Sequence, residues 1–596
     1  MLTIYRQLFA LLDRAERRQI YVLLLLMTLM ALVDMVGVAA ILPFLAVAAD
    51  PVAARDNGVL AWLYQASGMT SDRGFILLLG VLVLIFFLLG LAVKLAGQRR
   101  IIRFGRLRVH SFGVRLLVRN LGQPYAWYLS RNSADLGRAI LSECDHVVGS
   151  ALTPALKLLT QGLLVLCLLG FLVAINPAVA FAAALGVGGS YGLIFLFVRR
   201  RLTRLGKRQL AANSARYRIA QEAFGGIKEV KLLGLEERYH ARYEGPSRQY
   251  ADNSAQSQII GELPRFLLEA VAFGGLVLLI LGLLVLQESR LTDVLPTLGV
   301  FGFAVLKIFP AIQQIYQSLT QMRFGAPVLA RLHEELAPPL QLPVAATGSV
   351  APRPLRESLT LQDLHFSYPA AGGAALNGLS LSIKVNTTVG IVGGTGAGKT
   401  TAVDLILGLL TPESGRILAD GIPLGPDNMR SWQNAIGYVP QQIFLIDDSV
   451  AANIAFGLPP EARNMAAVER AARLAELHDF VIRDLSQGYD TEVGERGVRL
   501  SGGQRQRIGI ARALYHDPSV LILDEATSAL DNLTERAVMD AVTNLAHAKT
   551  IIMIAHRLST VRACDTIFLM EHGRLAAQGT FDELVASNET FRRMAS

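Results

Sequence analysis

Apolar residues dominate the first half of the chain, where they form long stretches that end near residue 325. A helix needs about 20 residues to cross the hydrocarbon core of a bilayer, and each of these stretches is long enough. The pattern therefore predicts six transmembrane helices. They cover residues 19–48, 75–97, 146–175, 178–198, 264–287 and 294–317.

Basic residues give these spans an expected orientation. The long segment between spans at 98–145 has "RRIIRFGRLR" near its start, and the long segment at 199–263 starts with "RRRLTR". Loops rich in Arg and Lys stay in the cytoplasm, and the opposite connections carry little charge. We therefore expect both chain termini to lie in the cytoplasm.

Two segments beside the spans carry patterns of their own. Residues 2–18 repeat apolar positions at helical spacing, which predicts an amphipathic helix on the inner leaflet. "AVA" at 46–48 resembles a signal-peptide cleavage site, but the apolar run before it is about twice as long as the apolar region of a signal peptide. This length favours a transmembrane span that is not cleaved off. The first external loop, residues 49–74, contains "VLAWLYQASG", which either a small interfacial helix or an aromatic belt would explain.

The second half of the chain has the pattern of a soluble α/β domain. Residues 336–358 combine Pro, Ala and Gly without apolar periodicity, which marks a linker. After it, short β-rich runs such as "SVLILDE" and "TIIMIAH" alternate with helical segments, as a mainly parallel sheet requires. We expect a helical transmembrane domain over 1–335, the linker, and an α/β phosphate-loop ATPase domain over 359–596.

Composition supports a membrane protein without nucleic acid as a partner. The 596 residues are 52% hydrophobic and 18% charged, with a net charge of +9. The positive charge accompanies the apolar spans rather than one soluble face, so the membrane explains it better than nucleic acid does. The three cysteines lie far apart without ligand spacing, which argues against a disulfide framework or a zinc site.

"GGTGAGKT" stands between the strand "TVGIV" and the helix "TAVDLILGLL". Its glycines let backbone amides curl around phosphates, while Lys399 reaches the β and γ phosphates and Thr400 binds magnesium. The loop therefore predicts binding of a nucleoside triphosphate with Mg²⁺. The expected ATP-binding residues here are Gly393, Gly394, Thr395, Gly396, Ala397, Gly398, Lys399, Thr400 and Thr401.

A second buried strand, "VLILDE", ends in two acids. Asp524 can hold magnesium through water, and Glu525 is placed to orient or deprotonate the attacking water. Alone, the pair could end any buried strand. With the phosphate loop, it predicts an ATPase whose catalytic base is Glu525.

"LSGGQ", Leu500 to Gln504, resembles the signature of the ABC ATPases, and the match extends along the whole domain in the family's order. The resemblance implies that Ser501, Gly502, Gly503 and Gln504 contact ATP. The only departure is "KVNTTVG" before the phosphate loop, where the family more often carries Gly with an acid. The other matching positions are Tyr368 for stacking on adenine, Gln441 for sensing magnesium and the membrane domain, Asp531 in the D-loop, His556 as the switch histidine near the γ phosphate, and Glu495 in the "TEVGERG" loop of exporters.

In this family one ATP is held between the phosphate loop of one domain and the LSGGQ of another. Because one chain has one of each, the resemblance implies a dimer. Intact Glu525, His556 and LSGGQ favour a homodimer, and a heterodimer is the alternative. The family's coupling helices correspond to residues 122–136 and 222–239, where Ile227 and Val230 are the expected coupling residues.

The cargo depends on charges in the spans. Lys307 falls near mid-membrane, and Lys94 and Arg265 lie toward the cytoplasmic side. Such charges usually face a cavity or another charge, although snorkelling to the headgroups would also suit Lys94 and Arg265. "GELPRFLLEAVAFG" and "LKIFP" resemble segments of bacterial lipid-linked oligosaccharide flippases. The resemblance implies a polyprenyl-pyrophosphate-linked glycan carried across the bacterial inner membrane, with Arg265, Lys307 and Lys94 as substrate residues.

Other functions remain alternatives at different strengths. An exporter of another lipid, a glycolipid or a hydrophobic drug would have the same fold. A peptide exporter is disfavoured because no Cys and His protease pattern precedes the first span. An importer is disfavoured because the membrane and ATPase halves are fused. An ABC ATPase of DNA repair or translation is excluded if the apolar spans insert.

Overall fold

The protein is described here by a computed structural model. It describes the whole chain except residues 42, 45–46, 48–57, 69–70, 176, 178–179, 182–183, 287–290, 337–349, 369–372, 526–538, 541–544, 547, 556–557 and 596. The chain divides into two compact units. The first comprises Met1–Gln123 and Ser130–Pro343, and the second comprises Pro124–Leu129 and Val344–Ser596.

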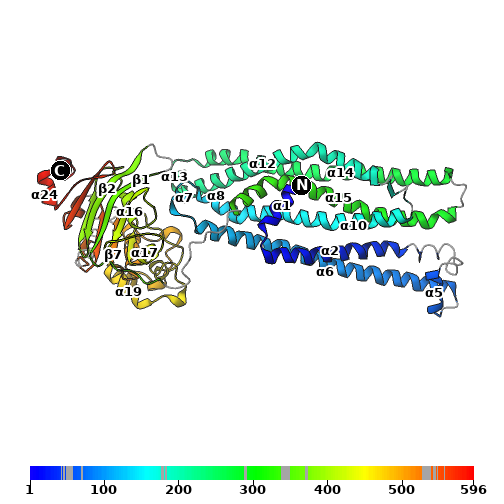
Figure 1. Ribbon diagram of the computed structural model, residues 1–596, viewed down its shortest axis with the longest axis horizontal. Helices are drawn as coiled ribbons and strands as arrows, with labels where there is room; N and C mark the ends of the chain where they lie inside the picture. Colours follow the sequence, from blue (N-terminus) through cyan, green and yellow to red (C-terminus); the bar gives the residue numbers. More distant parts are fainter. Residues whose placement is uncertain are drawn as a thin grey trace. The chain divides into compact units, whose positions relative to one another are not determined.

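All regular secondary structure in the described part of the first unit is helical (Figure 1). Between α8 and α10, residues 139–152 form two π-helical turns, η1 and η2, around the short α9. The helices of this unit are α1 (Leu2–Leu11), α2 (Arg14–Ala39), α5 (Gly58–Ala66), α6 (Asp72–Leu121), α8 (Ser133–Arg138), α9 (Cys144–Val147), α10 (Thr153–Ile175), α12 (Gly189–Gly225), α13 (Ile227–Leu232), α14 (Glu236–Leu286) and α15 (Leu291–Leu336).

Several of these helices are much longer than a membrane span. At 50 residues, α6 is about 75 Å long, so its apolar first half continues directly into the arginine-rich segment. Within the described residues, Arg14–Ala39, Asp72–Leu121 and Ser133–Ile175 have the length and apolar composition to cross a bilayer. The other predicted spans, at 178–198, 264–287 and 294–317, include positions outside the described residues or side chains.

The start of the chain is tied to α6. A capping box begins α2, in which the Glu16 amide donates to Asp13 Oδ1 at 2.7 Å and the Asp13 amide donates to Glu16 Oε2 at 3.0 Å. The buried Glu16 carboxylate also pairs with Arg108 and accepts from Ser111 Oγ at 2.6 Å. These contacts fix the turn between α1 and α2. In the loop that the sequence predicts to be external, residues Gly58–Ala66 form the short helix α5.

The second unit contains two β-sheets. The antiparallel sheet has the order β2–β1–β4–β5, and the larger sheet has the order β10–β9–β3–β8–β7–β6. In the larger sheet only β10 pairs antiparallel. The strands are β1 (Ser358–Ser367), β2 (Ala374–Lys384), β3 (Thr388–Val392), β4 (Ser414–Ala419), β5 (Ile422–Pro423), β6 (Ile436–Val439), β7 (Val520–Asp524), β8 (Thr550–Ile554), β9 (Thr566–Glu571) and β10 (Arg574–Gly579).

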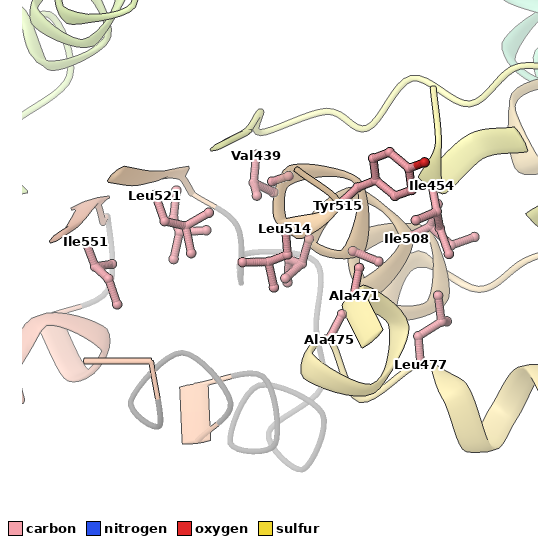
Figure 2. Packing of buried hydrophobic residues seen from close by; sticks show 14 of the residues in the cluster. Val439, Ile454, Ala471, Ala475, Leu477, Ile508, Leu514, Tyr515, Leu521 and Ile551 are labelled. Carbon is pink, nitrogen blue, oxygen red and sulfur yellow. The ribbon is translucent and has the colours of Figure 1, made fainter. Parts of the chain in front are cut away.

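Two apolar cores hold this unit together. Every residue of β3, β7 and β8 is buried, as expected for parallel strands covered on both faces. Figure 2 shows part of one core, where Leu521 of β7 lies near Leu514 of α21 (Gly502–Leu514). The other described helices are α7 (Tyr125–Leu129), α16 (Lys399–Ile406), α17 (Met429–Gln433), α18 (Val450–Ile454), α19 (Met465–Leu474), α20 (His478–Asp484), α23 (Leu558–Val561), α24 (Phe581–Ser587) and α25 (Glu589–Ala595).

The parallel pairing of β3, β8 and β7 places their carboxyl ends at one edge of the sheet. The phosphate loop follows β3, and Glu525 follows β7. Ligands of open α/β sheets bind at this edge, so the topology alone brings the two predicted motifs together.

Candidate functional site

The phosphate loop has a backbone that only glycine allows. Gly393 has φ +154°, and a Cβ there would lie 2.3 Å from the Met570 carbonyl oxygen. Gly398 has φ +96°, and its Cβ would lie 2.6 Å from the Ala375 carbonyl oxygen. Both positions therefore exclude side chains on conformation and on space. Gly394, Thr395 and Gly396 remain exposed at the tip of the loop.

Lys399 lies inside this loop. Its Nζ donates to the carbonyl oxygens of Gly393 at 2.7 Å and Gly394 at 3.1 Å. Burial lowers the pKa of Lys399, and the carboxylates of Glu525 and Asp524 oppose that shift. The ammonium is thus held at the phosphate loop, at the N-terminus of α16. A phosphate bound there would be attracted both by the ammonium charge and by the positive end of the helix dipole. Thr400 is exposed beside it, whereas Ala397 and Thr401 are buried.

Gln441 and Glu525 are in direct contact. Gln441 Nε2 donates to Glu525 Oε2 at 2.7 Å, and the Glu525 amide donates to the Ile554 carbonyl oxygen at 3.1 Å. Glu525 has φ +49°, a conformation that costs a non-glycine residue about 1–3 kcal/mol. Such strain is typical of functional positions, where it aims a side chain. The arrangement is suited to orienting and deprotonating a water molecule.

Asp524 is buried at the end of β7, where Tyr438 Oη donates to its Oδ2 at 3.4 Å. A carboxylate together with the Thr400 hydroxyl is the oxygen donor set that Mg²⁺ prefers, with phosphate oxygens and water completing the shell. The residues present therefore fit the magnesium that the sequence predicts. Among the described residues, no group of three His, Cys, Asp or Glu side chains forms a separate metal site.

Sequence reasoning missed three side chains around this site. Burial and the Asp524 carboxylate raise the pKa of Asp404, on α16, to about 6. The second is Tyr438, which contacts Asp524. The third is Tyr125, on α7, whose pKa is raised by burial and by the nearby Asp404 and Tyr368. Tyr125 lies in the predicted coupling segment 122–136, of which residues 124–129 belong to the second compact unit. An acidic residue one turn into the helix after the phosphate loop was the available signal for Asp404.

Tyr368 is the predicted adenine-stacking residue. Its hydroxyl lies 3.2 Å from Thr401 Oγ1, and its ring meets the ring of Phe366 edge to face, with the centroids 5.0 Å apart. The aromatic side chain is therefore held beside the phosphate loop, within reach of a bound nucleotide.

The LSGGQ segment forms the N-terminus of α21. Ser501 is the N-cap in a capping box: the Gln504 amide donates to Ser501 Oγ at 3.2 Å, and the Ser501 amide donates to Gln504 Oε1 at 2.7 Å. Gly502 and Gly503 form the first turn, and the segment is exposed or partly exposed. A helix N-terminus with an exposed serine hydroxyl is suited to binding a phosphate.

Five other predicted residues are placed less completely. Asp531 and His556 lie outside the described residues. Glu495 is exposed in a single helical turn, Glu495–Gly497. On α13, the predicted coupling residues differ, because Ile227 is 44% exposed and Val230 only 5%.

The membrane unit contains a small charged cavity. Asp34 of α2, Lys94 of α6 and Lys307 of α15 line it together with apolar side chains. Lys94 Nζ lies 2.5 Å from Asp34 Oδ2, and Lys307 Nζ lies 3.6 Å from Asp34 Oδ1. Arg265 is not among the described lining residues. It is about half exposed on α14, where its Nε donates to Glu269 Oε1 at 2.9 Å.

Comparisons with known proteins match both halves of the chain. Residues 19–295 match the family model described as "ABC transporter transmembrane region", and residues 376–528 match the model described as "ABC transporter". The predicted fold class, a helical membrane domain followed by an α/β ATPase domain, is confirmed.

The chain is similar to the ATP-dependent lipid A-core flippase of Cupriavidus pinatubonensis, with 34% identity over 474 residues that cover 79% of each chain. It is also 35% identical over 403 residues to the heterocyst differentiation ATP-binding protein HepA of Nostoc sp., covering 66% of this chain and 64% of that protein. A solved structure of a bacterial Atm1-family ABC exporter with ATP bound has a TM-score of 0.77 and 26% identity, covering 98% of both chains.

Proposed function

Because the chain belongs to the ABC transporter family, where it has the arrangement of an exporter that hydrolyses ATP, we propose that it flips a lipid with a phosphorylated headgroup. The observation that carries this proposal is the cavity between α2, α6 and α15. It presents two lysines and one carboxylate among apolar side chains. Ionisable groups at membrane depth are costly and usually mark a substrate path.

ATP hydrolysis in the ATPase domain would supply the energy for flipping. Lys399 and the loop amides would bind the β and γ phosphates, and Thr400 and Asp524 would hold magnesium. Glu525 would take the proton of the attacking water while Gln441, which donates to its carboxylate, orients it. Bound magnesium would neutralise phosphate charge in the transition state. Electrostatic stabilisation and positioning carry most of the catalysis in phosphoryl transfer.

The proposed working unit is a homodimer, with a heterodimer as the alternative. Ser501 and Gly503 of each chain would bind the ATP held by the phosphate loop of the other. Their exposure and their place at a helix N-terminus support this role. Asp531 and His556 complete the proposed site on the family resemblance.

We place the protein in a bacterial inner membrane, with both termini and the ATPase domain in the cytoplasm. The arginines that continue α6 beyond its apolar half support this orientation. The proposed division into a transmembrane domain at 1–335, a linker at 336–358 and an ATPase domain at 359–596 is supported by α15 ending at Leu336 and β1 starting at Ser358.

Two lipids fit the proposed substrate class. A polyprenyl-pyrophosphate-linked oligosaccharide is the candidate from the sequence, and lipid A-core is named in the relatives' descriptions. Both carry several negative charges on a glycan headgroup. Another lipid, a glycolipid or a hydrophobic drug is the alternative cargo, and an uncharged drug would have no use for Lys94 and Lys307.

Reconstitution in liposomes tests the proposal with both lipids as cargo. We expect ATP-dependent flipping of at least one of them, and a large loss of flipping in Lys307→Ala with ATP binding unchanged. Arg265→Ala tests the second residue of the sequence prediction. Arg106→Ala, which removes an exposed ion pair with Asp145, is the matched control. Wild-type protein that transports neither lipid would refute the proposed function.

A further inference from the structure

The carboxylate of Asp34 occupies the position that an anionic headgroup would need. It lies between the ammonium groups of Lys94 and Lys307, at 2.5 and 3.6 Å. Its side chain is 11% exposed, compared with 32% and 30% for the two lysines. Among the described residues that line this cavity, Asp34 is the one acidic side chain. The site is therefore already filled by an anion of the chain itself.

The helices hold Asp34 and Lys94 rigidly together. At Gly90 a Cβ would lie 3.0 Å from Val33 Cγ1, and at Gly97 it would lie 2.2 Å from Met30 Sδ. These glycines flank Lys94 on α6, so side chains of α2 pack directly against the α6 backbone on both sides of the ion pair. Figure 1 shows the two helices side by side, as their contacts also indicate. Asp34 thus has a fixed partner on α6.

Lys307 is bound less firmly. It is the more distant of the two ammonium groups, and it lies 5.4 Å from the centroid of the Phe87 ring, a weak cation–π contact. One carboxylate shared by two ammonium groups leaves a net charge of +1 on the three side chains. Uncompensated charge in an apolar environment attracts anions strongly. The cavity therefore favours an anionic ligand but restricts how it binds.

The restriction comes from space and from charge. The cavity has a volume of about 70 Å³, room for about two water molecules. A phosphate that joined Asp34 there would lie within a few ångströms of a like charge. A headgroup must therefore displace the carboxylate from the lysines. A headgroup with a single negative charge would gain little binding energy by replacing the Asp34 carboxylate at the lysines. The carboxylate belongs to the same chain and is therefore present at a high effective concentration.

We propose that Asp34 is the specificity-determining residue of this cavity: it competes with the headgroup for Lys94 and Lys307, so that only a headgroup with two or more negative charges displaces it. The ligand class is a lipid with a pyrophosphate or two phosphates. Monoanionic phospholipids of the surrounding bilayer are rejected. This inference rests on the proposed function and names the charge that its substrate must carry.

The test measures lipid binding to the full-length, nucleotide-free protein in phosphatidylcholine nanodiscs, by native mass spectrometry. The probes are phosphatidylglycerol, a monoanion, and lipid A, whose phosphate monoesters each carry close to two negative charges at neutral pH; inorganic pyrophosphate tests whether a free anion suffices. Wild type should prefer lipid A. In Asp34→Asn the competing carboxylate is removed, so the affinity for phosphatidylglycerol should rise on the order of tenfold. The affinity for lipid A, which already displaces the carboxylate in the wild type, should rise less, and the preference for lipid A should narrow.

Two further variants separate competition from a structural role. Asp34→Asn combined with Lys94→Met removes the whole ion pair, restores a net charge of +1 and should bring both affinities back toward wild type. It also covers the case in which Asp34→Asn alone fails to fold. Asp145→Asn, at an exposed ion pair, is the control and should change neither affinity.

The outcomes distinguish this inference from the proposed function. Equal gains for both lipids, or losses for both, in Asp34→Asn would overturn the role of Asp34 while leaving lipid flipping intact. Tight binding of inorganic pyrophosphate alone would overturn the lipid as ligand. A wild-type protein that binds neither anionic lipid would contradict the proposed substrate class itself.

Discussion

Ser501 has two separable roles, which substitutions can distinguish. Its hydroxyl caps α21 by accepting from the Gln504 amide, and in the proposed dimer it also binds the phosphate of ATP. Ser501→Ala removes both functions. Ser501→Asn keeps a good N-cap residue and removes only the small hydroxyl. The pair of variants therefore separates the stability of the helix from contact with the nucleotide.

The expected loss of stability follows from the capping box. Replacing a serine N-cap by alanine costs about 1 kcal/mol, which corresponds to about fivefold more opening of the first turn. Hydrogen–deuterium exchange on the full-length chain should show this increase for the amides at the start of α21 in Ser501→Ala, and wild-type exchange in Ser501→Asn.

The nucleotide contact predicts a different pattern. Loss of one donor that stabilises transition-state charge lowers turnover on the order of 100-fold, so both variants should lose ATPase activity to that extent. Wild-type exchange in Ser501→Ala would show that the cap does not stabilise the first turn of α21. Ser501→Asn with normal ATPase activity would refute the proposed contact with ATP across the dimer.

Three further predictions concern other parts of the chain. Glu525→Gln keeps an oxygen for the hydrogen bond from Gln441 but cannot take a proton, so ATP should stay bound without turnover; brisk hydrolysis would exclude Glu525 as the base. The raised pKa of Asp404 means that the folded state binds its proton more tightly than the unfolded state, so the unfolding free energy falls as the pH rises from about 4 to about 6. Asp404→Asn should therefore raise the melting temperature at pH 7.5 and lose that advantage near pH 4, and an equal gain at both values would contradict this. Ile227→Ser should leave ATPase activity in place and abolish transport, whereas Val230 is buried and a change there would perturb folding as well; coupled transport in Ile227→Ser would remove this residue from the coupling role.

The nucleotide site could be predicted in detail because its geometry is local. Each motif is a short segment whose glycines, caps and strand ends impose the same backbone wherever they occur, as the positive φ of Gly398 and the capping box at Ser501 show. Apart from Asp404, what the sequence missed there depends on long-range contacts. Tyr438 contacts Asp524 only because β6 and β7 are neighbours in the sheet.

Helix bounds were harder to predict for a related reason. Apolar runs stop where the membrane would end, but the hydrogen bonds of a helix continue through polar residues. The predicted span at 75–97 is thus part of the 50-residue α6. The π-helical turns at 139–152 have no apolar period that would have revealed them.

The charged cavity shows why the partner of an intramembrane charge cannot be derived from its position along the sequence. Depth alone placed Lys307 near mid-membrane and left snorkelling to the headgroups as an alternative for Lys94 and Arg265, but it gave no counter-ion for any of them. Packing separates them: Arg265 has Glu269 one turn away on its own helix, whereas Lys307 must share a carboxylate with Lys94. Because Lys307 shares the Asp34 carboxylate with Lys94, its charge is only partly neutralised and it still attracts an anion. Arg265 is paired with Glu269 alone and attracts an anion much less. The acidic residue therefore decides which basic residue is available to the substrate, and for this reason Asp34 is the first residue to change in a search for the cargo.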